Sequence, residues 1–184
     1  MSKIVIVFHS GYGHTKKVAE AVAESSGGTL LPIDAEGNLP EGGWEQLAAA
    51  DAIVFGSPTY MGGASWQFKK FADASSKPWY AQVWRNKLAA GFTNSATLNG
   101  DKFSTLTYLF TLSQQHGMLW AGMGMKAPNA KANTRDDVNH LGGYAGLITV
   151  TPSDASTEEM VPGDIASAKA FGARVVEALK LLGK

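Results

Sequence analysis

The arrangement of the chain is decided by residues 3–15, which read KIVIVFHSGYGHT. The first six residues are mainly β-branched and apolar, a pattern that predicts a strand buried on both faces. From Thr15 onward, apolar residues recur at helical spacing until Gly27 and Gly28, which predicts an amphipathic helix over 15–28. The turn between strand and helix holds two glycines and two hydroxyl side chains, so we expect it to bind a ligand.

The same alternation of strand and helix continues along the chain. Short apolar runs predict strands, and longer amphipathic runs predict helices. The strands are expected at 3–8, 29–33, 52–56, 87–93 and 118–123, with the sheet resuming at 146–150, and the helices at 15–28, 44–50, 64–75, 102–117 and 162–183. Residues 76–86 are expected to be irregular. This order predicts an α/β fold, a doubly wound parallel sheet with helices on both faces, in one domain spanning 1–184.

In such a sheet, ligands bind beyond the carboxyl ends of the strands. The loops expected there are 9–15, 57–63, 93–101 and 124–144. The last of these is a polar stretch of unusual length, which is itself an indication of function.

Composition excludes several classes of protein. Sixteen lysines and arginines balance sixteen acids, so no net charge favours nucleic acid or a membrane surface. The chain has no cysteine, which excludes disulfides, thiol catalysis and iron–sulfur clusters. No apolar run reaches the length of a membrane span, no signal peptide is evident and no histidine lies in a metal-ligand spacing, so we expect a cytoplasmic protein without a metal.

The first turn allows three phosphate-binding interpretations. A triphosphate loop is excluded because G-x-x-x-x-G-K-[ST] is absent. A dinucleotide fingerprint fails at its third glycine, where Lys16 stands, although Asp34 lies where a ribose-binding acid is expected. A single terminal phosphate, held by backbone N–H groups and by the hydroxyls of Ser10 and Thr15, is the interpretation we favour. Thr15 could also serve only as a helix N-cap, and the turn could be free of ligand.

Two later loops suit a flat ring with polar edges. Residues 55–63, FGSPTYMGG, follow the third strand, and residues 93–100, TNSATLNG, follow the fourth. The second of these loops is rich in hydroxyl and amide side chains, which make a poor core but can surround a ring. We expect the two loops to flank one ligand from opposite sides.

Four stretches, SGYGHT (10–15), FGSPTYMGG (55–63), TNSATLNG (93–100) and QHGM (115–118), resemble the flavodoxin-like NAD(P)H:quinone oxidoreductases of the WrbA type. The resemblance covers most of the chain in the right order. It implies a five-stranded sheet of order 2-1-3-4-5, non-covalently bound FMN, and two-electron transfer from NADH or NADPH to quinones. It also implies a homodimer or a homotetramer.

The resemblance assigns site residues position by position. It places Ser10, Gly11, Tyr12, Gly13, His14 and Thr15 at the phosphate, and Pro58, Thr59, Tyr60, Met61 and Gly62 on one flank of the flavin ring. On the other flank it places Thr93, Asn94, Ser95, Ala96, Thr97, Leu98 and Asn99. His116 is implied beside the flavin and Trp79 near the substrate. The chain departs from the family where Ala96, Leu98 and Asn99 replace glycines and Met61 replaces a phenylalanine.

Within this interpretation, catalysis is assigned to His116 and Trp79. His116 could stabilise charge on the flavin or on a quinone oxygen, or it could simply cap a helix C-terminus. Trp79, Tyr80 and Trp84 could stack on a nicotinamide or merely pack under a loop. Basic residues at Lys69, Lys70, Lys77, Arg85 and Lys87 suit a phosphate-bearing nicotinamide cofactor. The alternative function is a flavodoxin-type electron carrier, although such carriers are usually strongly acidic and this chain is neutral.

Overall fold

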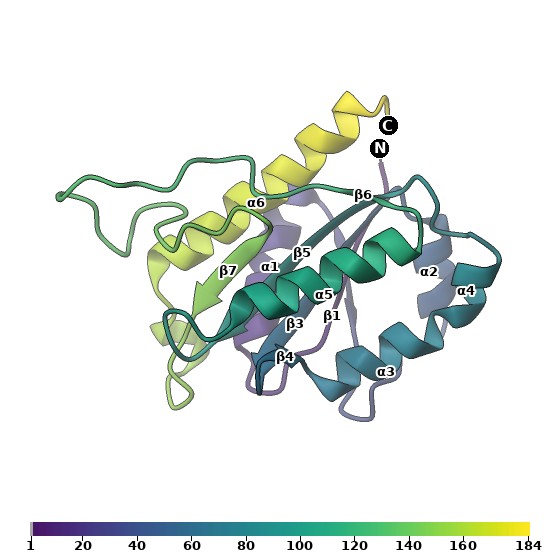
Figure 1. Cartoon of the computed structure of the whole chain (residues 1–184), viewed down its shortest axis with the longest axis horizontal. Coiled ribbons are helices and arrows are strands. Elements are labelled where there is room, and N and C mark those ends of the chain that lie inside the picture. Colours follow the sequence, from purple (N-terminus) through teal and green to yellow (C-terminus); the bar gives the residue numbers. More distant parts are fainter. Residues whose placement is uncertain (1) are drawn as a thin grey trace.

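The computed structural model describes residues 2–184, and its centre is one twisted sheet (Figure 1). The hydrogen-bonded order is β2-β1-β3-β5-β6, and β7 also pairs with β5. The strands are β1 (Ile4–Phe8), β2 (Thr29–Pro32), β3 (Ala52–Tyr60), β4 (Gly63–Ala64), β5 (Leu88–Ser95), β6 (Leu119–Trp120) and β7 (Leu147–Val150). All pair in parallel except β4, which forms an antiparallel hairpin with β3.

Strands β6 and β7 together occupy the fifth position of the sheet. Leu119 pairs with Leu88 at the start of β5, and Leu147 pairs with Phe92 nearer its end. The predicted order 2-1-3-4-5 is therefore confirmed, with the fifth strand divided between two segments.

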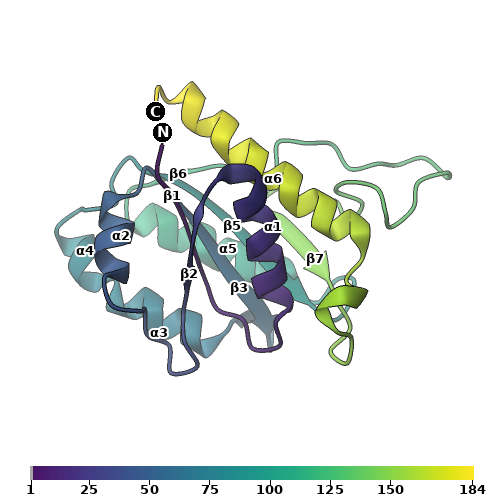
Figure 2. The same cartoon turned by 180° about the vertical axis from the view of Figure 1, so that it is seen from behind.

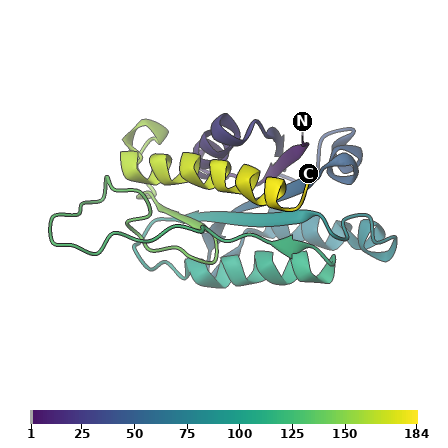
Figure 3. The same ribbon diagram turned by 90° about the horizontal axis from the view of Figure 1, so that it is seen from above.

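Helices cover both faces of the sheet (Figure 3). Helices α1 (His14–Ser26) and α6 (Pro162–Leu181) lie side by side on one face (Figure 2). Helices α2 (Gly43–Ala49), α3 (Trp66–Ala74) and α5 (Lys102–Gln115) pack on the other, and the short α4 (Ser76–Tyr80) follows α3. A single 3₁₀ turn, η1 (Thr157–Glu159), precedes α6 and was not predicted.

The alternation of side chains along β1 explains why this strand is central. Ile4, Ile6 and Phe8 enter the core beneath α1 and α6, whereas Val5 and Val7 enter the core beneath α2, α3 and α5. Because both sets are buried, the strand is apolar at every position. Its carboxyl end opens directly into the glycine-rich turn.

Three local predictions are corrected. Strand β3 does not end at residue 56, because Ser57 and Pro58 continue to pair with Thr93 and Asn94 of β5. The segment 76–86 is not wholly irregular, because residues 76–80 are helical. Helix α1 begins at His14 with Gly13 as its N-cap, so Thr15 lies inside the first turn and is not the cap.

The segment between β6 and β7 extends away from the sheet as a long loop (Figure 1). Arg135 Nη2 donates to the buried Asp164 carboxylate at 2.9 Å, and the Asn139 N–H donates to Ser167 Oγ at 2.7 Å. Both contacts tie the loop to the start of α6. Within residues 2–184, no helix is both long and apolar enough to cross a bilayer.

Candidate functional site

A cavity of about 250 Å³ opens at the carboxyl edge of the sheet. Residues from four segments line it, following β1, β3, β5 and β7. They are Tyr12, His14, Thr15, Pro58, Thr59, Tyr60, Asn94, Ser95, Ala96, Thr151 and Ser153. The three loops expected to meet therefore surround one space, and a fourth segment joins them.

The turn before α1 is built to receive an anion. Gly13 has a φ of 90°, a left-handed conformation that favours glycine, and it starts the helix without a side-chain cap. The backbone N–H groups of Tyr12, His14 and Thr15 make no hydrogen bond with the described residues. No acidic residue occupies the first turn of α1. The partial positive charge of the helix start is therefore available to a ligand.

The two predicted hydroxyls are free to donate. Ser10 Oγ accepts from the Lys16 N–H at 3.1 Å, which leaves the hydroxyl proton for another acceptor. The Thr15 hydroxyl makes no hydrogen bond to a described residue, although its side chain lines the cavity. Both groups fit a phosphate at this helix start.

A segment that sequence reasoning missed encloses the same turn. Thr151 and Ser153 follow β7, and His14 Nε2 lies 2.7 Å from the Ala155 carbonyl oxygen, to which it donates. A Cβ on Gly13 would come within 3.2 Å of the Thr157 methyl group. We expected the fifth strand to deliver residues 124–144 to this edge. The strand expected at 146–150 was the signal that residues 151–157, and not 124–144, would lie at the carboxyl edge of the sheet.

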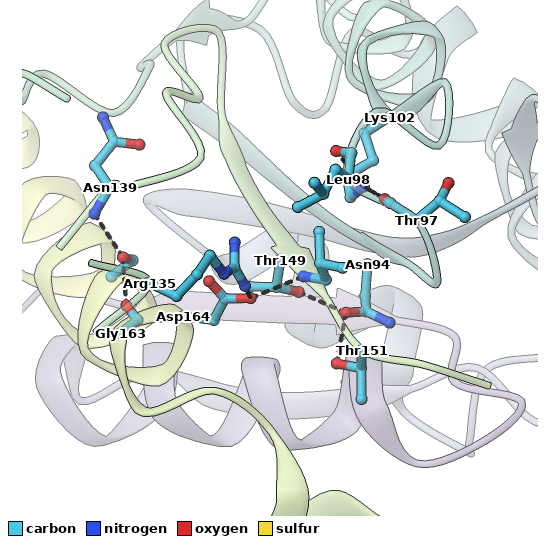
Figure 4. A network of polar contacts seen from close by, with 12 residues as sticks. Asn94, Thr97, Leu98, Lys102, Arg135, Asn139, Thr149, Thr151, Gly163 and Asp164 are labelled. Atoms are coloured by element: carbon cyan, nitrogen blue, oxygen red, sulfur yellow. Dashed lines mark hydrogen bonds and ion pairs between the residues drawn. The ribbon is translucent and has the colours of Figure 1, made fainter. Parts of the chain in front are cut away.

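Buried hydroxyls and an amide fix the strand ends below the cavity. Thr59 Oγ1 lies 2.8 Å from both Thr93 Oγ1 and Thr105 Oγ1. Asn94 Oδ1 accepts from Thr149 Oγ1 at 2.8 Å and from Thr151 Oγ1 at 3.1 Å, as Figure 4 shows. Thr93 is completely buried and holds Thr59, so the prediction that it contacts a ligand is corrected to a supporting role.

Two tyrosines stand at the mouth of the cavity. The rings of Tyr12 and Tyr60 meet edge to face with centroids 6.2 Å apart. The Tyr60 hydroxyl packs against Gly11, where a Cβ would approach it to 2.6 Å, so a larger residue there would displace the Tyr60 ring. Partial burial raises the pKa of Tyr60, which keeps the phenol neutral at physiological pH. Met61 and Gly62 form the exposed tip of the β3–β4 hairpin outside the cavity wall.

The loop after β5 enters the cavity only at its beginning. Ser95 and Ala96 line the space, and the buried Ser95 hydroxyl has no partner among the described residues. Thr97, Leu98 and Asn99 lie beyond the cavity wall, exposed, with their carbonyls turned toward Lys102.

Comparison with known proteins gives a consistent family. Residues 5–105 match the family model described as a flavodoxin domain. Flavodoxin FldP of Pseudomonas aeruginosa strain UCBPP-PA14 is 49% identical over 175 residues, covering 95% of each chain. This chain belongs to the flavodoxin-domain family.

Two further relatives agree with that family. A WrbA-like flavodoxin of Agrobacterium tumefaciens has a solved structure with a TM-score of 0.82 and 50% identity, covering 98% of this chain and 99% of the other. A protein named NAD(P)H dehydrogenase (quinone) from Geobacter sulfurreducens is 32% identical over 208 residues, covering 98% and 99% of the two chains. The resemblance seen in the four sequence stretches is thereby confirmed.

Membership of the flavodoxin-domain family implies a flavin cofactor, and the residues present fit one. A phosphate fits the uncapped start of α1 with its free N–H groups and hydroxyls. The aromatic mouth formed by Tyr12 and Tyr60 suits a flat ring. Asp34, the residue that kept a dinucleotide in consideration, instead accepts from the Asn38 N–H at 2.7 Å within a turn.

His116 does not belong to the cavity of this flavodoxin-domain chain. It follows the last turn of α5, whose 14 residues extend about 20 Å from the carboxyl edge to the amino edge of the sheet. There the His116 ring is buried. Its Nε2 lies 2.9 Å from Ser75 Oγ, and its ring centroid lies 4.1 Å from that of Trp84. Burial lowers the pKa of His116 to about 4, so the ring is neutral at physiological pH. Within one chain His116 therefore lies away from the cavity, and its catalytic role stays a prediction.

Trp79 lies at the same amino edge. It belongs to α4, which lies apart from the β3–β4 hairpin (Figure 1), and it shares a surface hollow with Ser75 and His116. Trp84 is completely buried against Phe55 and Phe71, so it is a core residue rather than a stacking wall. Neither tryptophan reaches the flavin cavity from within the same chain.

The predicted basic residues divide between two places: Lys69 and Lys70 line a hollow with Tyr60 and Met61, whereas Lys87 is buried at the start of β5. Lys69 pairs with Asp73, Lys70 donates to the Glu36 carbonyl, and Lys87 is buried against backbone carbonyls of residues 48 and 50. Residues 2–184 contain no cluster of side chains that could hold a metal ion.

Proposed function

We propose that this chain binds FMN and uses it to transfer two electrons from NADH or NADPH to quinones. The observation that carries the proposal is the single cavity into which the α1 start, the end of β3 and the end of β5 all open. We also propose that residues 1–184 form one FMN-binding domain. When bound, FMN would supply two-electron redox chemistry, and the residues of the cavity would hold it where a nicotinamide and then a quinone can reach it in turn.

The chain itself would bind and orient the cofactor. Gly13, His14 and Thr15 would offer N–H groups to the phosphate, with hydroxyl protons from Ser10 and Thr15. Thr59, Tyr60, Ser95 and Ala96 would flank the ring.

The aromatic mouth of the cavity and the absence of net charge favour small flat substrates over a charged protein partner. Exposed Tyr12 and Tyr60 stand at this mouth, and Lys69, Lys70 and Asp73 line a neighbouring hollow together with Tyr60 and Met61. The chain as a whole has no formal net charge. A quinone or a nicotinamide can pack on such a surface, whereas a docking flavodoxin usually relies on charge.

The second candidate is an electron carrier that docks to redox proteins. It is favoured by the relative named flavodoxin, which is more similar to this chain than the relative named NAD(P)H dehydrogenase (quinone). It is also favoured by the remoteness of His116 and Trp79 from the cavity.

Two measurements test the proposal. Protein incubated with FMN and freed of excess should be yellow, and heat should release FMN rather than FAD. The loaded protein should then oxidise NADPH steadily with benzoquinone and no other protein. A colourless protein would overturn flavin binding, whereas a yellow protein without turnover would favour the carrier.

Variants of the phosphate-binding turn test the mode of binding. Replacing both Ser10 and Thr15 with alanine should weaken FMN binding strongly, because each hydrogen bond to a charged group is worth about 1.5–3 kcal/mol. Riboflavin, which lacks the phosphate, should bind equally well to the variant and the wild type. Unchanged FMN affinity would place the phosphate elsewhere.

We also keep the proposal of a homodimer or homotetramer. Static light scattering of the loaded protein measures its mass directly, and a mass of 19.4 kDa would contradict it.

A further inference from the structure

Lys102 is a lysine in a place where lysine is normally disfavoured. It is the first residue of α5, where the helix dipole opposes a cation, and its side chain is only 2% exposed. No carboxylate among residues 2–184 forms an ion pair with it. The nearby Asp164 is instead bonded to Arg135 and to the Val150 N–H. A buried lysine without an ion pair requires another explanation.

The partners of Lys102 are three consecutive carbonyls of the loop after β5. Its Nζ donates to the carbonyl oxygens of Thr97 and Leu98 at 2.5 and 3.1 Å (Figure 4), and to that of Asn99 at 3.3 Å. All three donor protons of the ammonium are thereby used. Burial lowers the pKa of Lys102 to about 8, which still leaves most molecules charged at neutral pH.

This arrangement sets the direction of the N–H groups in the loop. In a trans peptide the carbonyl and the following N–H point in opposite directions. Because the carbonyls of residues 97–99 face Lys102, the N–H groups of residues 98–100 face away from it. None of these N–H groups makes a hydrogen bond with a described residue. Such a row of free N–H groups attracts electronegative atoms.

The loop is also closed tightly around the lysine. Gly100 has a φ of 53°, and a Cβ there would lie 2.0 Å from Ser95 Oγ and 3.1 Å from Lys102 Nζ. Ser95 and Ala96, at the start of the same loop, line the cavity. The orientation that Lys102 imposes is thus passed directly to the wall of the site.

We infer that Lys102 is a positioning residue, which fixes the peptide planes of the loop 96–101 and, through them, the start of the loop at Ser95 and Ala96 that lines the cavity proposed for flavin. The inference rests on the proposed binding of flavin in the adjacent cavity. Lys102 itself need not touch the ligand.

The chain supplies a matched control in Lys87. This lysine is also buried, and its Nζ also donates to backbone carbonyls, those of Ala48 and Ala50. It immediately precedes β5, at the amino edge of the sheet, whereas Lys102 follows the carboxyl end of that strand. Lys102→Met and Lys87→Met therefore remove the same ammonium group from similar surroundings, at opposite ends of β5.

The experiment compares binding of FMN and of riboflavin to both variants. Lys102→Met should weaken both ligands by the same factor, about tenfold or more, the value of one well-made hydrogen bond. Lys87→Met should leave both affinities within about twofold of the wild type, even if it lowers thermal stability. The milder Lys102→Gln, which can still donate to carbonyls, should bind with intermediate affinity and remains usable if the methionine variant does not fold.

A second readout separates positioning from general weakening. Reduced flavin carries more negative charge at the ring edge, so free N–H groups favour it over oxidised flavin. Lys102→Gln loaded with FMN should therefore have a lower two-electron midpoint potential, by about 30 mV for each tenfold change in preference.

Failure of the inference is distinguishable from failure of the proposed function. A wild type that binds neither flavin overturns both. A wild type that binds FMN, with unchanged affinity and potential in the Lys102 variants, overturns only the positioning role. Equal losses in the Lys102→Met and Lys87→Met proteins would also overturn it, because the effect would then follow stability rather than the loop.

Discussion

At the scale of single residues, two glycines bracket α1 and differ in what surrounds them. Gly13 and Gly27 have φ angles of 90° and 66°, so alanine at either position is strained. A Cβ on Gly13 would also lie 3.2 Å from Thr157, whereas a Cβ on Gly27 would meet nothing within 4 Å. Gly13 additionally forms the start of the phosphate-binding turn.

We therefore expect Gly13→Ala and Gly27→Ala to have separable effects. Each should lower the free energy of unfolding by about 1–2 kcal/mol, the usual cost of a left-handed non-glycine residue. Only Gly13→Ala should weaken FMN binding, by about tenfold or more. Urea unfolding without flavin and flavin titration measure the two quantities. Similar FMN affinities in the two variants would contradict the assignment of the turn.

His116 gives a prediction about pH. Its pKa is lowered from 6.5 to about 4 by burial, so the folded protein resists a proton that the unfolded chain accepts. The contribution of neutral His116 to the free energy of unfolding is fully present above pH 6.5. As the pH falls from 6.5 toward 4, the free energy of unfolding should fall by about 3 kcal/mol on account of this group.

His116→Phe should flatten that dependence while leaving FMN affinity unchanged. At pH 7 the variant should be less stable by about 1 kcal/mol, because the hydrogen bond to Ser75 is lost. Some pH dependence will remain, since burial also lowers the pKa of His9. Denaturant unfolding at pH 7 and 4.5 provides the comparison. An unaltered slope would mean that His116 is not the titrating group.

At the scale of elements, the long loop between β6 and β7 is held by one buried ion pair. Asp164 is 3% exposed, so removing Arg135 leaves a buried carboxylate without its partner. Arg135→Met should cost about 3 kcal/mol of unfolding free energy. Lys169 is also on α6, and Lys169→Met, which breaks its exposed pair with Glu24 of α1, should cost less than about 1 kcal/mol. Equal costs in urea unfolding would show that the loop is anchored by other contacts.

The elements could be predicted from the sequence where their signals are local. The run from Ile4 to Phe8 and the stripe of α1 are each encoded within a few residues, and both appear as expected. The extension of β3 through Pro58 could not be read locally, because it depends on pairing with Asn94, 36 residues away in the chain. The division of the fifth strand similarly depends on β5, which supports β6 and β7 at its two ends.

The same distinction explains the residues of the site. Ser10 to Thr15 and Thr59 to Tyr60 follow directly from strand ends, so their meeting was predictable. His116 was placed beside the flavin by resemblance alone. His116 follows α5, which runs back from the carboxyl edge of the sheet to its amino edge, and this geometry argues against a position beside the flavin. Thr151 and Ser153 were missed because the long loop between β6 and β7 separates them from the first half of the fifth strand.

At the scale of the whole molecule, charge separates the two candidate functions. The sixteen cations and sixteen anions cancel, and benzoquinone itself carries no charge for the protein to attract. Reaction of the FMN-loaded, pre-reduced protein with neutral benzoquinone should therefore depend little on salt. We expect its second-order rate constant to change by less than about twofold between ~10 mM and ~500 mM NaCl.

Rapid-mixing absorbance measurements at several salt concentrations test this expectation. Electron transfer to a charged redox protein, guided by long-range attraction, would instead slow by about tenfold or more over the same range, because salt screens the attraction within a few ångströms. The matched measurement replaces benzoquinone with cytochrome c, a basic one-electron acceptor. If the cytochrome reacts faster than benzoquinone at low salt and loses that advantage at high salt, the result supports the carrier function and contradicts the proposed quinone reduction. A salt-independent preference for benzoquinone is the behaviour expected of a protein without net charge that passes electrons to a neutral acceptor.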